Sequence, residues 1–333
     1  MIVSKNVVLA DCDVPDNWDF ISGLTEYTGE EWSVKKLVSN RNHGGRLQNL
    51  IRYLKYFYFP FLILLGKNKY KRIITWQQFY GLVLSFYFRV FNVKNAPKIT
   101  VMTFIYKPKS GLKGWIYDKF IEYSVSSNYI ANFVVYSKNE VDYYSDIFKV
   151  DQSKFNYIRL GVEDYYGRFK TSDNGRFLSA GRSNRDYEFL VSNWCFGDLD
   201  IICDDLKCNL KNKYVTIFDN CYGDEFLNLL SKCHAVVISL DDENISSGQL
   251  VILQAMMFGK IVICTDNCSV RDYIDDGVNG FIISKNVYDL QRCVNLINDA
   301  DTNLRISNNA RKTFEDKFSE FSMGKSVGRI VND

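Results

Sequence analysis

The sequence predicts an α/β protein made of two doubly wound, Rossmann-like domains of similar size. Its 333 residues are enough for about two domains of ~150 residues each. Short apolar runs alternate with helical segments along the whole chain, a pattern typical of parallel sheets that helices cover on both faces. A hydrophobic content of 47% with 24% charged residues and only 4 Pro excludes a disordered or fibrous chain.

The apolar runs predict six strands in each half of the chain. In the first half they cover residues 6–11, 32–38, 72–76, 98–103, 132–137 and 155–160, with helices between them. In the second half they cover residues 176–180, 200–203, 214–218, 235–240, 261–265 and 281–283. Helices in that half are expected at 223–233, 249–258, 287–298 and 302–318.

The polar stretch 163–174 is the best candidate for a linker between the domains. We therefore expect a first domain at 1–165 and a second domain at 166–315. Ligands of doubly wound domains bind at the carboxyl ends of the strands. A site is accordingly expected in the cleft between two such domains.

The sequence gives no sign of a membrane span, a secretory signal or a metal site. No window holds ~18 uninterrupted apolar residues, and the N-terminus runs straight into a polar, aspartate-rich segment. The nine cysteines include no C-x2-C pair, and the two histidines, His43 and His234, lie far apart in sequence. We expect reduced thiols, no metal or other cofactor, and a cytoplasmic protein.

Charge is distributed very unevenly along the chain. Residues 32–117 contain no Asp or Glu but sixteen of the 41 Lys and Arg residues. The rest of the chain therefore contains 25 basic residues and all 39 acidic ones. A basic block of this kind attracts phosphate groups. Its basic residues are interleaved with large apolar ones, and from Arg46 onwards the apolar residues have helical spacing.

Three interpretations of this basic block remain open. It could be a core-facing helical region with a solvated basic face. It could instead dock on an anionic membrane surface, because basic amphipathic helices with aromatic residues lie in membrane interfaces. Binding to nucleic acid is the least favoured, because the sequence contains no nucleic-acid recognition module and the excess charge is local.

The segment 235–283 carries the most informative chemistry. An acidic loop at 241–243 follows a strand, and Ser246-Ser247-Gly248-Gln249 then opens a helix. Small hydroxyl residues and a glycine at a helix start leave backbone N–H groups bare for an anion, which predicts a phosphate site that needs no metal. Helix capping alone would also explain these residues.

The same segment resembles the donor-binding part of the retaining GT-B glycosyltransferases of family 4, also called group 1. The resemblance lies in Leu-Gln-Ala-Met-Met-Phe-Gly-Lys-Ile-Val-Ile at 253–263, Asp-Gly-Val-Asn-Gly at 276–280 and Phe-Leu-Ser-Ala-Gly-Arg at 177–182. Residues 133–140 and 158–163 resemble the family's approach to its linker. The likeness is specific over about 132–281. It implies a GT-B fold whose last helix, at about 316–333, packs back on the first domain.

Two positions depart from the family's pattern. The family carries a pair of glutamates, with seven residues between them, at positions that correspond here to Ser246 and Gln254. Gln254 could still accept a hydrogen bond from a ribose hydroxyl through its amide oxygen. The role of the first glutamate near the sugar would pass to the catalytic candidates Glu243 or Asp242, or be lost.

The resemblance also implies a diphosphate site. The family's Arg-plus-Lys pair corresponds to Arg182 and Arg185, and arginine binds phosphate through two parallel hydrogen bonds. The remaining candidates for binding the diphosphate are Gly181, Ser247, Gly248 and Gln249. Phe218 joins Gln254 as a candidate for contact with the ribose or the base.

Candidates on the acceptor side come from the first domain. Family members often keep a histidine after the fourth strand, where this chain has Thr103 instead. His43, in a glycine-rich loop, could substitute as a catalytic group on the acceptor side, or it could simply lie in a turn. Trp76 and Gln77, at the end of the third expected strand, suit a sugar by stacking and hydrogen bonding, or they pack and cap a helix.

The resemblance implies a metal-independent, retaining glycosyltransferase. It would move a hexose or N-acetylhexosamine from a nucleotide-diphosphate sugar, UDP-linked by family frequency, to a saccharide or lipid-linked acceptor in surface polysaccharide synthesis. The basic first domain would dock on the anionic inner face of the cell membrane. No nucleic-acid partner is expected. The alternative is a catalytically inactive GT-B protein that serves as a binding or regulatory partner.

Overall fold

The computed structural model describes residues 5–38, 46–204, 206, 211–243, 245 and 247–332, and the side chains of all of these except 46–49. The chain forms two compact units. The first joins Met1–Ile158 to Met323–Asp333, and the second is Arg159–Ser322. Each unit is built on one six-stranded parallel sheet, which confirms the predicted class of two doubly wound domains.

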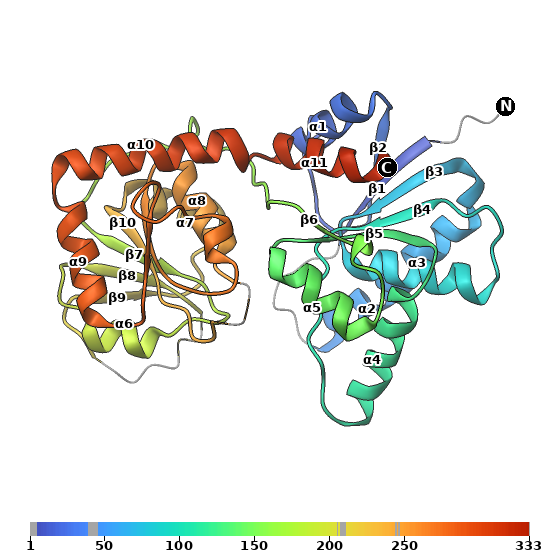
Figure 1. The fold of residues 1–333 in the computed structure, drawn as a ribbon, viewed down its shortest axis with the longest axis horizontal. Helices are drawn as coiled ribbons and strands as arrows, with labels where there is room; N and C mark the ends of the chain where they lie inside the picture. Colours follow the sequence, from blue (N-terminus) through green and yellow to red (C-terminus); the bar gives the residue numbers. More distant parts are fainter. Residues whose placement is uncertain are drawn as a thin grey trace. The chain divides into compact units, whose positions relative to one another are not determined.

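In the first unit the strand order is β2-β1-β3-β4-β5-β6 (Figure 1). Its strands are β1 (Lys5–Ala10), β2 (Trp32–Lys36), β3 (Tyr70–Thr75), β4 (Lys98–Val101), β5 (Ile130–Val135) and β6 (Phe155–Tyr157). Its helices are α1 (Asp19–Thr28), α2 (Arg46–Leu65), α3 (Gln78–Val90), α4 (Gly111–Val125), α5 (Lys138–Phe148) and α11 (Glu320–Asn332), with 3-10 turns at Lys67–Lys69 and Gln152–Lys154. The order in which the chain adds strands to the sheet reverses between β1 and β3. Ligands of such sheets bind at the carboxyl ends of the strands beside this reversal.

The strands of this sheet are apolar because helices cover both of its faces. In β1 every residue after Lys5 is buried. Val7 and Leu9 belong to one core with Ile73 of β3 and Tyr80 of α3. A continuous apolar run of this kind is the sequence signature of a parallel strand, which explains why the run was recognisable.

Helix α2 uses only one of its faces in this core. Tyr56, Phe59 and Ile63 are buried, with Tyr56 and Phe59 against the ring of Tyr80. The helix continues through Pro60, although proline removes a helical hydrogen bond. Among the described residues, no helix has both the length and the apolar character needed to cross a membrane.

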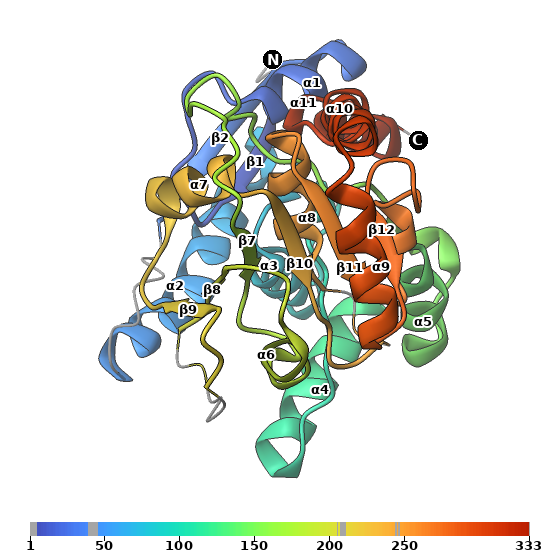
Figure 2. The same ribbon diagram turned by 90° about the vertical axis from the view of Figure 1, so that its left-hand side faces the viewer.

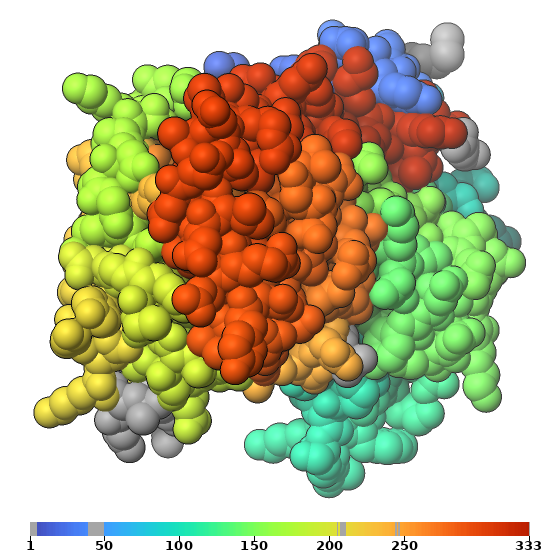
Figure 3. All heavy atoms as spheres, turned by 60° about the vertical axis from the view of Figure 1, so that its left-hand side comes forward, coloured from blue at the N-terminus to red at the C-terminus, as the bar shows by residue number. Residues whose placement is uncertain are grey.

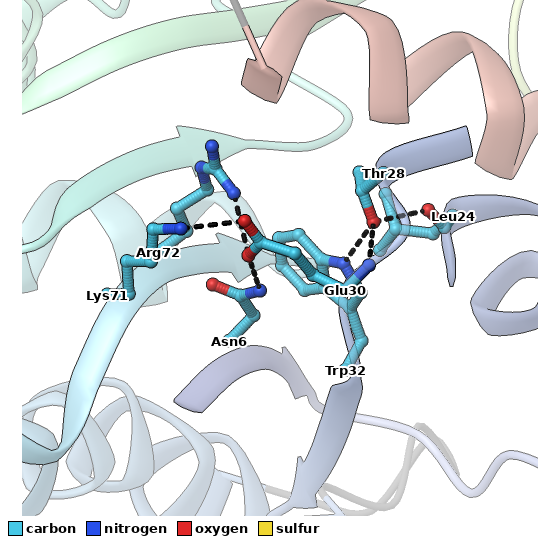
Figure 4. Close-up of polar contacts among 7 residues, drawn as sticks. All are labelled: Asn6, Leu24, Thr28, Glu30, Trp32, Lys71 and Arg72. Atoms are coloured by element: carbon cyan, nitrogen blue, oxygen red, sulfur yellow. Dashed lines mark hydrogen bonds and ion pairs between the residues drawn. The ribbon is translucent and has the colours of Figure 1, made fainter. Parts of the chain in front are cut away.

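A cluster of charged and amide groups joins the amino ends of β1 and β3 (Figure 4). Glu30 lies just before β2, and its carboxylate accepts from Lys71 Nζ at 2.6 Å and Arg72 Nη1 at 2.9 Å. Asn6 Nδ2 donates to the same carboxylate at 2.5 Å. These contacts, the hydrogen bond with Lys71 foremost, lower the pKa of Glu30 to about 2.

Helix α11 lies beside α1, far from it in sequence but in the same unit (Figure 1). Gly324 allows this close approach, because a Cβ there would overlap the carbonyl oxygen of Phe20 and come within 2.9 Å of the amide nitrogen of Leu24. Lys325 pairs with Glu26 at 2.9 Å. The last helix therefore packs closely against α1 within the first unit.

In the second unit the strand order is β12-β11-β10-β7-β8-β9 (Figure 2). Its strands are β7 (Phe177–Ala180), β8 (Leu199–Ile202), β9 (Val215–Phe218), β10 (Ala235–Ile238), β11 (Ile261–Thr265) and β12 (Phe281–Ile283). Its helices are α6 (Tyr187–Asn193), α7 (Gly223–Lys232), α8 (Gln249–Met257), α9 (Val287–Ile297) and α10 (Ala300–Lys317), with a 3-10 turn at Val270–Asp272. Here the order of the strands reverses between β7 and β10.

Helices α9 and α10 form much of the face of the second unit seen in Figure 3. Helix α10 also fixes the segment that the sequence suggested as a linker. Arg311 of α10 forms paired bonds with the carboxylate of Asp164, at 3.0 and 2.7 Å. Tyr165 and Phe169 pack against the core of the second unit. The units thus divide after Ile158, before the boundary expected from the sequence at 165.

Candidate functional site

A pocket of about 270 Å³ opens at the carboxyl end of the second sheet. It lies where β7 and β8 end and where α7 and α8 begin, on one side of the reversal in strand order. Its walls are formed by Ala180, Gly181, Arg182, Ile202, Cys203, Asp204, Cys221, Tyr222, Gly223, Phe226, Leu250, Val251 and Gln254. Three of the residues expected to bind the sugar donor, Gly181, Arg182 and Gln254, are thus brought to one pocket.

Arg182 presents a cation to this pocket. Its side chain is 52% exposed, and Nη1 lies 3.9 Å from Oδ2 of Asp204. This separation exceeds hydrogen-bond length, so Asp204 balances the charge of Arg182 without a hydrogen bond to that atom. An arginine whose side chain is half-exposed at a pocket can bind an anionic ligand through its guanidinium.

Arg185 lies behind the Gly181 turn and is held by backbone oxygens. Its Nε donates to Ala180 O at 2.9 Å and its Nη1 to Ser183 O at 2.9 Å. Burial lowers the pKa of its guanidinium, which still stays charged at neutral pH. Arg185 is thus a second cation beside the pocket, and it forms no ion pair with any carboxylate that the structure describes.

Gly181 is the residue that makes this arrangement possible. Its φ of 117° lies in the region that favours glycine. A Cβ at this position would come within 2.6 Å of Nη2 of Arg185. This contact explains the glycine of the motif at 177–182, because the guanidinium of the half-buried Arg185 occupies the space that a side chain at 181 would need.

The start of α8 is joined to the loop that carries both arginines. Asn184 Nδ2 donates to the Ser247 hydroxyl at 2.9 Å and to the Asp242 carbonyl at 2.9 Å. Gly248 caps the helix with a φ of 91°. The first amides of a helix have no intrahelical acceptor, so α8 begins with N–H groups that favour an anion. The side chain of Gln249 donates to Ser269 Oγ at 3.1 Å and does not line the pocket.

Gln254 lies one helical turn after Leu250, and both line the pocket from α8. Its side chain is half-buried and lines the same pocket as Asp204 and Tyr222. The position suits a hydroxyl-bearing ligand, because an amide can both donate and accept. Ser246, the other position that corresponds to a family glutamate, lies outside the described residues.

The acidic loop lines a different hollow of about 680 Å³, at the carboxyl ends of β10, β11 and β12. Its lining residues are Leu240, Asp241, Asp242, Glu243, Thr265, Asp266, Ile283, Ser284 and Lys285. Asp242 and Glu243 are therefore brought together, but not in the pocket that holds Arg182 and Gln254. In the described part of the chain, no group of three His, Cys, Asp or Glu side chains could hold a metal ion.

Phe218 ends β9, at the edge of the sheet, and packs partly against the core of the second unit. It does not line the pocket, where the aromatic residues are Tyr222 and Phe226. Sequence reasoning missed Tyr222 and Asp204. Asp204 had a recognisable signal, since it directly follows the second expected strand of its domain, a position at which doubly wound folds often carry an acid.

The candidates of the first unit lie at the carboxyl ends of its strands. Trp76 follows β3 and packs against Trp18 and Phe20, with ring centroids 4.7 and 5.0 Å away. Gln77 caps α3 and donates from Nε2 to Asp11 at 3.2 Å. These two residues lie at the reversal between β1 and β3.

The remaining candidates differ in what the structure says of them. Thr103 follows β4 with a φ of 56°, and its hydroxyl lies 3.1 Å from that of Tyr136. His43 lies outside the described residues. His234 precedes β10, and its Nδ1 lies 2.7 Å from Oδ2 of Asp173. It is therefore at the amino ends of the strands, whereas the pocket lies at their carboxyl ends.

Comparison with known protein families agrees with this geometry. Residues 201–313 match the family model described as glycosyl transferases group 1. The chain carries a group 1 glycosyltransferase domain. The matched residues include the ends of β8 and β10, both α7 and α8, and the acidic loop. They do not include Arg182 or Arg185, so those two assignments rest on the structure and on the resemblance of the motif alone.

Solved structures extend the likeness of this glycosyltransferase to the whole chain. Anabaena Alr3699/HepE in complex with UDP has a TM-score of 0.66 at 12% identity, covering 98% of this chain and 99% of that one. A glycosyltransferase from Rickettsia africae has a TM-score of 0.65 at 15% identity, covering 99% of both chains. Sucrose-phosphate synthase from Thermosynechococcus elongatus has a TM-score of 0.70 at 15% identity, covering 98% of both. These likenesses confirm the expected GT-B fold.

A comparison of the sequence with curated proteins gives no match.

Proposed function

We propose that this glycosyltransferase transfers a hexose or N-acetylhexosamine from a UDP-sugar to a lipid-linked or other saccharide acceptor, with retention and without metal. The observation that carries the proposal is the pocket at the carboxyl ends of β7 and β8. There, Arg182 and Gln254 line the same pocket, close to the start of α8. Structures of the similar Anabaena HepE contain UDP or UDP-glucose, which supports uridine as the first base to test.

The reaction needs stabilisation of the leaving diphosphate as negative charge builds on it. Arg182 at the pocket mouth, Arg185 behind Gly181 and the first amides of α8 supply positive charge and hydrogen-bond donors for that purpose. Preorganised cations of this kind replace the divalent metal that would otherwise neutralise the diphosphate. The backbone bonds that hold Arg185 reduce the reorganisation needed during the reaction.

The sugar would occupy the hollow formed by the acidic loop. Asp242 and Glu243 could accept hydrogen bonds from sugar hydroxyls and stabilise positive charge at the anomeric carbon. The loop is held in position by Asn184, whose Oδ1 accepts from the Asp242 amide at 2.7 Å. Because Asn184 also contacts Ser247, the proposed sugar and diphosphate sites share one support.

Nucleotide binding tests this proposal directly. Thermal shifts with UDP, GDP, ADP and CMP, each with and without EDTA, should reveal stabilisation by one diphosphate that EDTA leaves unchanged. Arg182→Ala should weaken diphosphate binding by about 10- to 100-fold and leave nucleoside binding almost unchanged, because hydrogen bonds to a charged group are lost. Equal losses for UDP and uridine would contradict the assigned role.

Arg292 of α9 provides a matched control for Arg182. Its side chain is 54% exposed and lies 3.9 Å from an aspartate, Asp289, much as Arg182 lies 3.9 Å from Asp204. Arg292→Ala should leave UDP affinity unchanged. A similar loss in both variants would indicate a general effect of net charge on binding, rather than a contact with the diphosphate.

The first unit would dock on a membrane surface and bind the acceptor there. Helix α2 turns a broad apolar face outward, formed by Leu50, Ile51, Tyr53, Leu54, Phe57, Tyr58, Phe61, Leu62 and Leu65. The side chains of Leu112, Trp115 and Ile116 on α4 are 75%, 59% and 56% exposed. Both helices pack on α3, and α4 projects from the first unit (Figures 1 and 2).

Charge complementarity supports an anionic lipid surface as the partner of these helices. Both helices begin within 32–117, where the chain has sixteen basic and no acidic residues. Lys107, Lys109 and Lys113 are exposed around the start of α4, next to Trp115. Exposed apolar side chains ringed by lysines are suited to the interface of a bilayer, where the apolar part inserts and the ammonium groups meet headgroups.

Flotation with vesicles tests this docking surface. The protein should float with vesicles that contain anionic lipid at low salt and be released at high salt. Leu112→Ser with Trp115→Ser should reduce the bound fraction several-fold. Leu304→Ser is the matched control, because Leu304 is 62% exposed on α10 of the other unit. Equal loss in the control, or binding insensitive to salt, would contradict the proposal, and tighter binding to random DNA than to vesicles would favour nucleic acid.

A further inference from the structure

Asp204 places a carboxylate in the wall of the proposed nucleotide pocket, which α8 also lines. Strand β8 ends at Ile202, and the amide of Cys203 still donates to Phe218 O at 3.2 Å. Asp204 is therefore the first residue to leave the sheet. Its side chain is 15% exposed and lines the same pocket as Gln254.

The carboxylate of Asp204 is held in place by two hydrogen bonds and has room to accept more. Its Oδ1 accepts from the amide of Asn220 at 2.8 Å, and its Oδ2 accepts from the hydroxyl of Tyr222. A carboxylate has about four acceptor positions, so capacity remains for hydrogen bonds from a ligand. Arg182, at 3.9 Å, is too distant to occupy it with a hydrogen bond.

The pocket lacks a carboxylate on its α8 side. Gln254 stands at the position where the resemblance expects a glutamate, and a neutral amide accepts a weaker hydrogen bond than a carboxylate does. The acid of this pocket comes instead from the end of β8. In doubly wound sheets an acid that follows the second strand is well placed for ribose hydroxyls, and β8 is the second strand of its unit, paired directly with β7.

We infer that Asp204 accepts a hydrogen bond from a ribose hydroxyl of the sugar donor, and so restricts the enzyme to ribonucleotides. The inference rests on the proposed nucleotide-binding function. It assigns the carboxylate of the ribose site to the end of β8, with Gln254 as a neutral partner in the same pocket. Tyr222 and Asn220 act as positioning groups that orient the Asp204 carboxylate.

The test compares ligands that differ by one hydroxyl. Dissociation constants of UDP, 2′-deoxy-UDP and 3′-deoxy-UDP are measured by titration calorimetry, with the GDP and ADP series in parallel. The native protein should bind the ribonucleotide at least about tenfold more tightly than one deoxy analogue, as expected for a hydrogen bond to a charged group. Equal affinities for all three ligands would overturn the inference without any substitution.

Variants then assign the preference to the carboxylate. Asp204→Asn should weaken binding of the ribonucleotide by about the same factor and leave the deoxy analogue unchanged. Adding Gln254→Glu to Asp204→Asn should restore part of the preference, because it returns a carboxylate to the same pocket. Tyr222→Phe, which keeps the carboxylate, should retain most of the preference.

The outcomes separate this inference from the proposed function. If nucleoside diphosphates bind but Asp204→Asn weakens all of them equally, Asp204 only supports the loop and the inference is wrong. If no nucleoside diphosphate binds the native protein, the proposed function itself fails, and the inference with it.

Discussion

Replacing Gly181 by alanine should damage nucleotide binding more than it damages the fold. Gly181 has a φ of 117°, which side-chain-bearing residues rarely adopt, and a Cβ there would lie 2.6 Å from Nη2 and 2.9 Å from Cζ of Arg185. Both separations are below van der Waals contact. The guanidinium must therefore move, and its hydrogen bonds to Ala180 O and Ser183 O are then lost or weakened.

The magnitude has two parts that a control can separate. Backbone strain from a side chain at positive φ costs about 1–3 kcal/mol. Loss of hydrogen bonds from a charged donor adds about 1.5–3 kcal/mol. Gly197→Ala shares the first part only, because Gly197 has a φ of 104° and no atom lies within 4 Å of its Cβ position.

Urea unfolding and UDP titration measure the two effects. Gly181→Ala should be the less stable variant by about 2 kcal/mol and should bind UDP at least about tenfold more weakly than the native protein. Gly197→Ala should lose stability but keep its affinity for UDP. Unchanged UDP affinity in Gly181→Ala, or equal loss in both variants, would refute the proposed link between this turn and the diphosphate.

Two further predictions concern the first unit. Glu30→Gln should lower the free energy of unfolding by about 2 kcal/mol at neutral pH. This magnitude follows from the pKa of Glu30, which is about 2 instead of 4.5, and it is discounted because the Glu30 side chain is 32% exposed to solvent. Because the folded-state pKa is lowered, this stabilisation is present above pH 4.5 and lost as pH falls towards about 2, so acid unfolding of the variant should be less steep there. Gly324→Ala should lower the melting temperature more than Gly328→Ala, because a Cβ at Gly324 would meet the backbone of Phe20 and Leu24, whereas a Cβ at Gly328 would come within 2.9 Å of Cβ of the half-exposed Tyr27. Similar melting temperatures would show that α11 does not need its close contact with α1.

The fold could be predicted because its strands are buried on both faces. Continuous apolar runs such as 235–240 and 261–265 have no polar alternation, and turn residues bound them. The boundary between the units was less predictable. Asp164 and Tyr165 look like linker residues in the sequence, but Arg311, far away in the chain, binds Asp164 and draws the segment onto the second unit.

The candidate site could be predicted only where a local motif specifies it. Gly181 and Arg182 follow a strand directly, so their position was readable from the sequence. Which residues share the pocket depends on strand order, which a local pattern does not encode. Tyr222 enters the pocket from the start of α7, whereas Phe218 ends on the core at the sheet edge. Both are aromatic residues near the end of β9, and only the fold distinguishes them.

The path of the chain through the two units delays the completion of both until the end of synthesis. The first unit includes α11, which is translated only after nearly all of the second unit has been made. The core of the second unit includes Phe314 and Phe318 at the end of α10, which still lie in the exit tunnel while the chain is bound to the ribosome. Helix α1 therefore lacks its partner, and the second core lacks its last aromatic side chains, until the finished chain is released.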